Sequence, residues 1–277
     1  MAKQDTQLLG SANPEELKTP FFQVPTHHRA FSLGVMALPT RYTDASCVMA
    51  TFEVDWDVAN ELIEAPDLEL VRLPNGKAVM NAVFYEYRRL TNGTPYNEAG
   101  IALLVNPKGY PLPADPEEAV TLPSDRRQVG QYIVDLPVTT GPACAAGIDL
   151  WGYPKFVTEI PFALDGKNFA GKVLDPEREG EFIISLEGEA GAEQKLPDWQ
   201  DLVLYSKFED QLFRATSDTR SDEGYSAEPG NFVLKTSATS LHPMAVRIRR
   251  LIGESATPKQ VAYTHHFQLR LNEGVGI

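Results

Sequence analysis

The sequence predicts a mainly β fold with a few helices (α+β), built as one domain. Short segments rich in β-branched and aromatic residues recur along the 277 residues, and Gly, Pro, Asn and Asp residues that favour turns separate them. A helical pattern interrupts them near Asp55, and no repeat of 20 to 50 residues is present. Many short strands with turns between them are typical of a barrel or sandwich core.

The domain is expected to begin near Phe21. Residues 1–20 are polar and predict a flexible N-terminal arm, whereas residues 21–277 predict a single domain. A chain of this length can bury one substantial core, and all-β barrels of this size are often single domains.

The first half of the domain contains strand, helix and hairpin signals in that order. Residues 31–51 have a strand-like pattern that Pro39 interrupts. Asp55 can cap a short helix, in which Trp56, Ala59, Leu62 and Ile63 have helical spacing. Residues 77–90 and 98–105 then predict a β-hairpin, because residues 91–95 between them favour a turn.

The second half begins with a proline-rich loop at 107–123, followed by a polar and basic segment at 124–132 that predicts a loop or a short helix. Alternation and turn signals predict the later elements. These are an apolar segment at 133–138, a turn at 165–168, strands at 180–186 and 232–236, a strand or short helix at 201–213, a loop at 217–230, a half-exposed strand at 246–252 and a closing strand at 261–271.

Charge and hydropathy exclude two classes of partner. The chain has 25 Lys and Arg residues against 38 Asp and Glu residues, which gives a net charge of −13, and it has no basic run. Such a charge repels nucleic acid and anionic lipid surfaces, so we expect no nucleic-acid and no membrane partner. No run of 18 apolar residues occurs and the first 20 residues lack the apolar core of a secretory signal, so we expect a cytoplasmic protein.

The common cofactor and metal motifs are absent from the sequence, so we expect no cofactor and no metal. There is no GxxxxGK[ST], GxGxxG, HExxH or GxSxG segment. Cys47 and Cys144 are too few for a disulfide framework or a cysteine zinc site. The pairs at 27–28 and 265–266 could each turn only one imidazole towards a shared metal, because adjacent residues of a strand face opposite ways.

The most informative segment runs from Gly147 to Phe156 and places Lys155 after an apolar, aromatic stretch. An ammonium group with an ordinary pKa of about 10.4 cannot attack a carbonyl until burial or a nearby cation lowers that pKa. Trp151, Tyr153 and Phe156 are neighbours that exclude water. Lys155 is therefore a candidate Schiff-base nucleophile, although such a lysine can equally lie at a strand end with its amine in solvent.

These residues carry a resemblance to the acetoacetate decarboxylase superfamily, which extends from about Phe22 to about Leu271. Gly147-Ile148-Asp149-Leu150 and Tyr153-Pro154-Lys155 resemble the family's Gly-Arg-Glu-Leu and Tyr-Pro-Lys segments, in which the lysine forms the Schiff base. Tyr96-Asn97-Glu98-Ala99-Gly100 resembles the family's Tyr-x-Glu-x-Gly. The resemblance implies a β-barrel core with a central funnel that holds the lysine, and assembly into a homo-oligomer.

The resemblance also implies roles for individual residues. Lys155 would attack the ketone of a small keto acid, and the imine would accept electrons as carbon dioxide leaves. Glu98 would act in acid–base chemistry or orient the substrate. Arg29 lies where the family has its substrate-binding arginine and would hold the carboxylate. For Arg29 and Glu98 a structural ion pair is the alternative.

Two positions depart from the decarboxylase pattern. Phe156 stands where the decarboxylases have a second lysine, so burial would have to activate Lys155. Asn81 stands where they have a further glutamate, and an amide cannot exchange a proton as a carboxylate does. We expect Asn81, Phe156, Trp151 and Tyr153 to contribute to substrate binding, and alternation leaves open which of Phe84, Tyr132, Trp151, Tyr263 and His266 face the funnel.

Three functions follow in order of preference. The first is decarboxylation of an acetoacetate-like β-keto acid through a lysine imine and enamine. The second is aldolase-dehydratase or hydratase chemistry on a pyruvate-like keto acid, which uses the same lysine. The third is a barrel that binds a ligand without catalysis.

Overall fold

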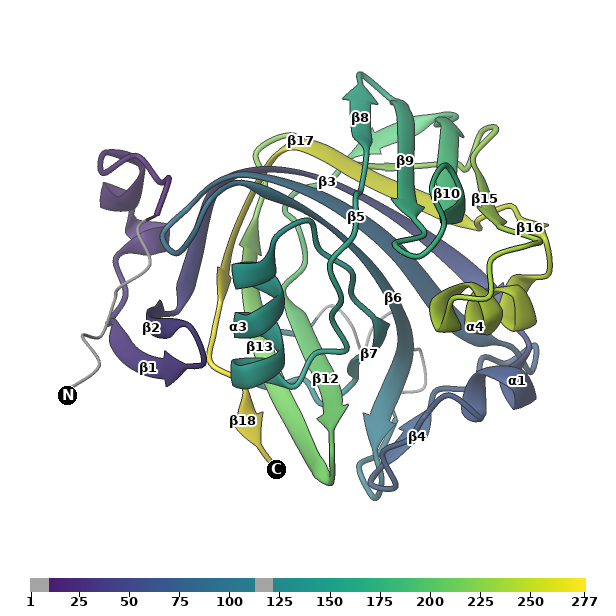
Figure 1. Ribbon diagram of the computed structural model, residues 1–277, viewed down its shortest axis with the longest axis horizontal. Coiled ribbons are helices and arrows are strands. Elements are labelled where there is room, and N and C mark those ends of the chain that lie inside the picture. The colour runs from purple at the N-terminus through teal and green to yellow at the C-terminus, as the bar shows by residue number, and fades with distance from the viewer. Residues whose placement is uncertain (1–9, 113–121) are drawn as a thin grey trace.

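The computed structural model describes residues 10–112 and 122–277, and its regular structure is mainly β, as predicted (Figure 1). The strands are β1 (His27–Phe31), β2 (Gly34–Leu38), β3 (Thr40–Val54), β4 (Leu68–Leu70), β5 (Ala78–Leu90), β6 (Tyr96–Pro107), β7 (Gly130–Asp135), β8 (Phe162–Asp165), β9 (Asn168–Leu174), β10 (Phe182–Glu189), β11 (Glu193–Lys195), β12 (Leu202–Phe208), β13 (Gln211–Arg220), β14 (Gly224–Ala227), β15 (Val233–Thr236), β16 (Ser255–Ala256), β17 (Gln260–Leu271) and β18 (Val275–Gly276).

The largest sheet closes into a barrel. Its strands are hydrogen-bonded in the order β17, β3, β5, β6, β7, β12 and β13, and a further pairing of β13 with β17 completes the ring. The closing pairs run from Ser217 opposite Leu271 to Arg220 opposite Gln268. Closure leaves no unpaired edge within the ring, which confirms the predicted β-barrel core.

Strand β6 has core residues on one face and polar residues of the candidate site on the other. Ala99, Ile101 and Leu103 belong to the main core, which also includes residues of the second sheet, β16-β15-β10-β9-β8. Because side chains alternate along a strand, Tyr96 and Glu98 point to the opposite face. One buried strand therefore anchors the core and presents a carboxylate on the other side of the wall.

The helices in the described ranges are α1 (Trp56–Asn60), α3 (Gly141–Trp151) and α4 (Pro243–Ile252), with 3-10 turns η1 (Glu16–Lys18) and η2 (Pro20–Phe22) before the barrel. Asp55 caps α1 as predicted, since its side chain accepts the N–H groups of Asp57 and Val58. Helix α3 lies under the arch of the long strands (Figure 1). None of the helices described is long and apolar enough to cross a membrane.

The predicted half-exposed strand at 246–252 is wrong, because these residues lie in α4. Met244, Ala245, Ile248 and Leu251 are buried, at spacings of one helical turn. Pro243 at the first turn and Gly253 after the last turn mark the ends of the helix.

Four other predicted segments can be compared with the structure. The predicted loop at 217–230 contains the end of β13 and the whole of β14, whose backbones pair with β17. No helix forms at 124–132, where β7 begins at Gly130. The predicted hairpin at 77–105 is confirmed as β5 and β6, and the turn at 165–168 joins β8 to β9.

The segment predicted as a flexible arm is described only in part. Residues 1–9 lie outside the described residues. From residue 10 onward the chain contacts the barrel, since the backbone N–H groups of Ser11 and Ala12 both donate to the carbonyl of Leu90, and Glu16 forms an ion pair with Arg89. The flexibility of the arm stays a prediction.

Candidate functional site

The end of α3 positions the lysine segment. Gly152 has φ of 62°, in the left-handed region that glycine tolerates, and its N–H donates to the carbonyl of Ile148 at 2.9 Å. The N–H of Tyr153 donates to Gly147 at 3.1 Å. These bonds terminate the helix, and Pro154 then prevents its continuation.

The chain after Pro154 runs beside residues 136–138, which in turn lie beside β6. The N–H of Leu136 donates to the carbonyl of Pro154 at 3.2 Å, and that of Val138 donates to Phe156 at 3.0 Å. On the other side, the N–H of Ala99 donates to Pro137 at 3.1 Å. Residues far apart in sequence are thus aligned, and Lys155 faces Glu98.

Lys155 and Glu98 form a buried ion pair. The amine Nζ donates to Glu98 Oε2 at 2.5 Å, and the two side chains are only 5% and 9% exposed. The hydroxyl of Tyr87 donates to the second carboxylate oxygen at 3.4 Å. The rings of Tyr96 and Tyr153 lie 6.0 and 5.8 Å from Nζ. The amine is therefore shielded from water, with a proton acceptor in direct contact.

Gly147 makes room for the lysine side chain. A Cβ atom at this position would lie 2.4 Å from both Cδ and Cε of Lys155 and 3.2 Å from Nζ. Real side chains do not approach so closely, so the lysine lies against the backbone of α3 only because residue 147 is glycine.

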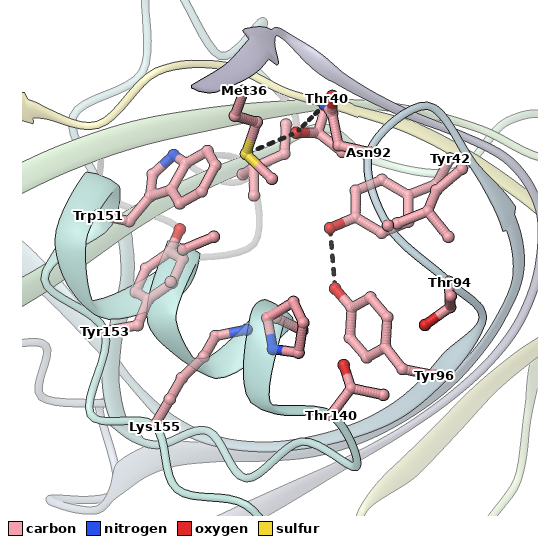
Figure 2. Close-up of a pocket in the computed structure, with 17 residues that line it drawn as sticks. Met36, Thr40, Tyr42, Asn92, Thr94, Tyr96, Thr140, Trp151, Tyr153 and Lys155 are labelled. Atoms are coloured by element: carbon pink, nitrogen blue, oxygen red, sulfur yellow. Dashed lines mark hydrogen bonds between the residues drawn. The ribbon is translucent and has the colours of Figure 1, made fainter. Parts of the chain in front are cut away.

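Lys155 lines a small cavity between α3, the β1–β2 hairpin and the starts of β3 and β6 (Figure 2). Its volume is about 30 Å³. The labelled lining side chains are Met36, Thr40, Tyr42, Asn92, Thr94, Tyr96, Thr140, Trp151, Tyr153 and Lys155. We call this space the Lys155 cavity.

The tyrosines around the cavity stay protonated. Burial raises the pKa of Tyr42, Tyr96 and Tyr153 well above the ordinary value, and the nearby Glu98 carboxylate raises each of them further. The hydroxyls of Tyr42 and Tyr96 hydrogen-bond each other at 2.9 Å. The site therefore offers neutral hydroxyl groups next to one ion pair.

The predicted residues Lys155, Glu98, Trp151 and Tyr153 come together here. Trp151 and Tyr153 are stacked with ring centroids 6.2 Å apart, and the Trp151 indole N–H donates to the carbonyl of Asn272 at 2.7 Å. Both line the cavity, while Glu98 reaches it through its contact with the lysine amine.

Arg29 is not brought into the cavity. It lies on the exposed strand β1, directly opposite the cavity residue Met36, and its guanidinium pairs with Glu273 at 2.7 Å. The His27 imidazole contacts the same carboxylate at 2.7 Å. A role for Arg29 in substrate binding stays a prediction.

Asn81 and Phe156 also lie outside the cavity lining. Asn81 is buried on β5, where it accepts from Thr51 and donates to Gln131. The Phe156 ring packs against His242 at 4.5 Å, on the core side of the segment that carries Lys155. Side chains alternate along this extended segment, so the residue after the lysine turns away from the amine. Substrate contacts by these two residues stay predictions.

Trp151 lines the cavity, whereas the other four aromatic candidates for the funnel are not among its lining residues. Phe84 and Tyr132 belong to the main core, Tyr263 donates to Glu193, and His266 lies 3.7 Å from Glu223. Sequence reasoning missed Tyr42 and Tyr96 as cavity residues. Strand alternation could have found Tyr96, which lies two residues before Glu98 on the same face.

The described residues contain no cluster of three or more side chains able to hold a metal ion. The two histidine pairs lie on β1 and β17, and His265 contacts the carbonyl of Gly166 at 2.9 Å. The absence of a metal and of a cofactor stays an expectation.

Comparison with known proteins gives the family. The model of the family described as acetoacetate decarboxylase matches residues 18–274. The chain belongs to this family, as its Tyr-Pro-Lys and Tyr-x-Glu-x-Gly segments predict.

Sequence identity to individual relatives is modest. The chain is 27% identical over 145 residues to an acetoacetate decarboxylase of Burkholderia mallei (strain NCTC 10229), a match that covers 51% of this chain and 46% of the relative. The match thus spans about half the length of this curated relative. Because of that partial coverage, the relative's activity is not carried to this chain directly.

Solved structures show the same fold. The acetoacetate decarboxylase of Legionella pneumophila aligns with a TM-score of 0.63 at 17% identity, over 96% of this chain and 98% of that one. The enduracididine biosynthesis enzyme MppR, complexed with the condensation product of pyruvate and imidazole 4-carboxaldehyde, aligns with a TM-score of 0.59 at 14% identity, over 98% and 97% of the two chains. At these identities the comparison establishes the fold.

Proposed function

We propose that this protein is a lyase that forms a Schiff base between Lys155 and a small keto acid, and that decarboxylation of an acetoacetate-like β-keto acid is its reaction. The observation that carries the proposal is the buried contact between Lys155 and Glu98 at the wall of a cavity. A lysine used only as a surface charge does not need burial or a dedicated carboxylate partner.

Glu98 supports the proton transfers that imine formation needs. At 2.5 Å from Nζ it can take a proton from the ammonium and free the amine to attack the ketone. The same carboxyl group can return a proton as the hydroxyl of the carbinolamine leaves as water. The protonated imine then accepts the electron pair of the breaking bond to the carboxylate carbon, the enamine takes up a proton, and water releases the product.

The walls of the cavity favour the loss of carbon dioxide, the step in which the iminium and carboxylate charges are both removed. Trp151 and the tyrosine rings keep water away from the iminium and from the substrate carboxylate. Loss of carbon dioxide neutralises the iminium and removes the carboxylate charge, so a water-poor site assists it.

Aldol condensation with dehydration is the second candidate. It uses the same imine and enamine. In decarboxylation the enamine takes up a proton, whereas here its carbon attacks the carbonyl carbon of an aldehyde. The observation in its favour is the common fold with MppR, which was solved with a condensation product of pyruvate and an aldehyde. Glu98 could serve this reaction as well, because dehydration also requires a proton donor next to the imine.

Reductive trapping tests the Schiff base. Borohydride should fix acetoacetate or pyruvate on the protein as one added group, and peptide mapping should place that group on Lys155. Lys155→Arg should give no adduct while keeping a wild-type circular dichroism spectrum. An adduct on another lysine, or none in the wild-type protein, contradicts the proposal and favours a ligand-binding barrel without catalysis.

Product analysis separates the two reactions. We expect carbon dioxide from acetoacetate, and a roughly 10²–10⁴-fold slower release in Glu98→Gln, because the amide keeps the shape of the carboxylate but cannot exchange protons. Enone formation from pyruvate and an aldehyde, without carbon dioxide from acetoacetate, would assign the second reaction.

The family resemblance also leads us to propose a homo-oligomer. Light scattering on the purified protein tests this, and a mass equal to one chain of 30.6 kDa would contradict it.

A further inference from the structure

The buried hydroxyl of Tyr153 at the Lys155 cavity has no hydrogen-bond partner among the described residues. Tyr153 is 4% exposed and lines the cavity, yet within residues 10–112 and 122–277 its hydroxyl contacts no donor or acceptor. A buried polar group without a partner is unfavourable, and such groups in folded proteins call for an explanation.

The neighbouring tyrosines differ in this respect. The hydroxyls of Tyr42 and Tyr96 bond each other, and that of Tyr87 donates to Glu98. Packing alone does not explain the unpaired hydroxyl of Tyr153 either, since a phenylalanine would stack on Trp151 equally well and bury no polar atom. Its hydroxyl is thus a buried polar group of the site that has a hydrogen bond to offer a ligand.

The position of this hydroxyl divides the cavity into two ends. Figure 2 shows the Lys155 amine pointing towards the middle of the cavity, near Tyr96 and Thr140. The hydroxyl of Tyr153 points away from the amine, to the side where Trp151 and Met36 lie. A ligand attached to the amine would therefore meet Tyr153 with its far end.

We infer that Tyr153 binds a second oxygen atom of the substrate, remote from the carbonyl carbon that Lys155 attacks. This inference rests on the proposed Schiff base for the point of attachment and adds a specificity-determining contact to it. The hydroxyl stays neutral and donates, because burial and the Glu98 carboxylate disfavour its ionised form. The substrate class is a ketone that carries an acceptor oxygen a few atoms from the reacting carbon.

Matched ketones test this inference without decarboxylation. 5-Hydroxy-2-pentanone and 2-pentanone have the same carbon chain and no charge, and they differ in the distal oxygen. Borohydride trapping at a series of concentrations gives the half-saturation and the maximal rate of adduct formation for each. In the wild-type protein the hydroxyketone should half-saturate at about a tenfold lower concentration, as expected for one buried hydrogen bond.

The variant Tyr153→Phe should abolish this preference by weakening binding of the hydroxyketone more than that of 2-pentanone, so that the two half-saturation concentrations become equal. Tyr132→Phe is the control, because Tyr132 is a buried tyrosine of the main core on the other face of the barrel wall, and it should keep the wild-type preference. Thermal melts of all three proteins check folding.

The outcomes separate the two claims. If neither ketone is trapped by the wild-type protein, the Schiff base itself is wrong. If both are trapped and Tyr153→Phe keeps the preference, or weakens both ketones equally, the second-oxygen site is overturned while the Schiff base stands.

Discussion

At the scale of single residues, the candidate site centres on one lysine whose side chain is almost fully buried. Burying an ammonium group is costly unless an anion compensates it, and Glu98 supplies that anion at 2.5 Å. The same carboxylate raises the pKa of the surrounding tyrosines. The electrostatics of the cavity are therefore organised around Glu98 as much as around Lys155.

Gly147→Ala tests whether the path of the lysine side chain matters. The new methyl group would meet Cδ and Cε of Lys155 at 2.4 Å, so the amine must move. We expect the rate of imine trapping to fall by about 10²-fold, the usual consequence of misplacing a reacting group by about 1 Å. Alanine also favours a helix over glycine by about 1 kcal/mol, so the loss should not come from a weaker α3.

Gly141→Ala is the matched control, since nothing lies within 4 Å of a Cβ atom at the first residue of the same helix. It should trap at the wild-type rate. Equal rates for both variants would show that Lys155 does not need its present path.

At the level of residues, short motifs named two side chains that the structure brings into contact. Lys155 and Glu98 could be named from the sequence, because each lies in a segment typical of the family. Arg29 could also be named, but not its partner Glu273, which lies 244 residues further along the chain. Contacts of that kind depend on how strands are ordered, which local sequence does not encode.

At the scale of elements, a charged cluster ties the segment before the barrel to β3 and β5. Arg88 donates to both carboxylate oxygens of Asp44 at 2.8 and 2.9 Å, and Arg89 joins Asp44 to Glu16. Asp44 lies at an irregularity in the β3–β5 register. Burial acts to raise the pKa of Asp44, but the hydrogen bonds and charges of Arg88 and Arg89 outweigh it and the pKa is lowered.

This cluster predicts a pH-dependent contribution to stability. Because the folded pKa of Asp44 is depressed, its contribution is present above the unfolded value of about 3.9 and is lost as the pH falls through the folded value. Asp44→Asn should lower the free energy of unfolding by about 1–3 kcal/mol at pH 7, and the deficit should shrink towards zero at about pH 2. Urea unfolding at both pH values measures it.

Asp210→Asn, at an exposed turn between β12 and β13, should change little at either pH. A deficit of Asp44→Asn that persists in full at pH 2 would mean that packing, and not charge, is responsible.

Element prediction failed where tertiary pairing outweighed local pattern. The alternation of arginine with apolar residues at 246–252 suggested a strand, yet Pro243 and Gly253 bracket a helix, and Pro142 and Gly152 bracket α3 in the same way. A proline followed about ten residues later by a glycine could therefore have predicted both helices from the sequence. The polar segment at 217–230 had no such signal, because its strands exist through pairing with β17.

At the scale of the whole molecule, closure of the barrel and formation of the site are linked. Asn272 follows β17 and donates its side-chain amide to Thr216 and Asp218 at 2.9 and 3.0 Å, across the β13–β17 seam. Its carbonyl accepts the indole N–H of Trp151. The residue that fastens the seam thus also holds a wall of the cavity.

Asn272→Ala should weaken the seam, because it removes the side-chain amide but keeps the carbonyl that Trp151 contacts. The loss of two partly buried hydrogen bonds should cost about 1–2 kcal/mol of unfolding free energy, and hydrogen exchange should become faster at the seam, near residues 216–220. Asn60→Ala, on the exposed surface at the end of α1, is the control. Unchanged exchange at the seam would contradict a fastening role for Asn272.

The β character of the fold followed from composition and turns, but the order of the strands did not. Pairing of β13 with β17 joins residues about 50 positions apart, and β7 pairs in parallel with β12 after some 70 intervening residues. Alternation defines which face a side chain takes but not which strand lies beside it.

The seam between β13 and β17 has a consequence for biosynthesis. Glu98 and Lys155 leave the ribosome well before Leu271, which lines the cavity, and before Asn272, which holds Trp151. The last part of the cavity wall is therefore made only after the reactive pair has been synthesised, so truncation before Leu271 would remove cavity-lining and Trp151-holding groups while leaving Lys155 and Glu98 in the chain.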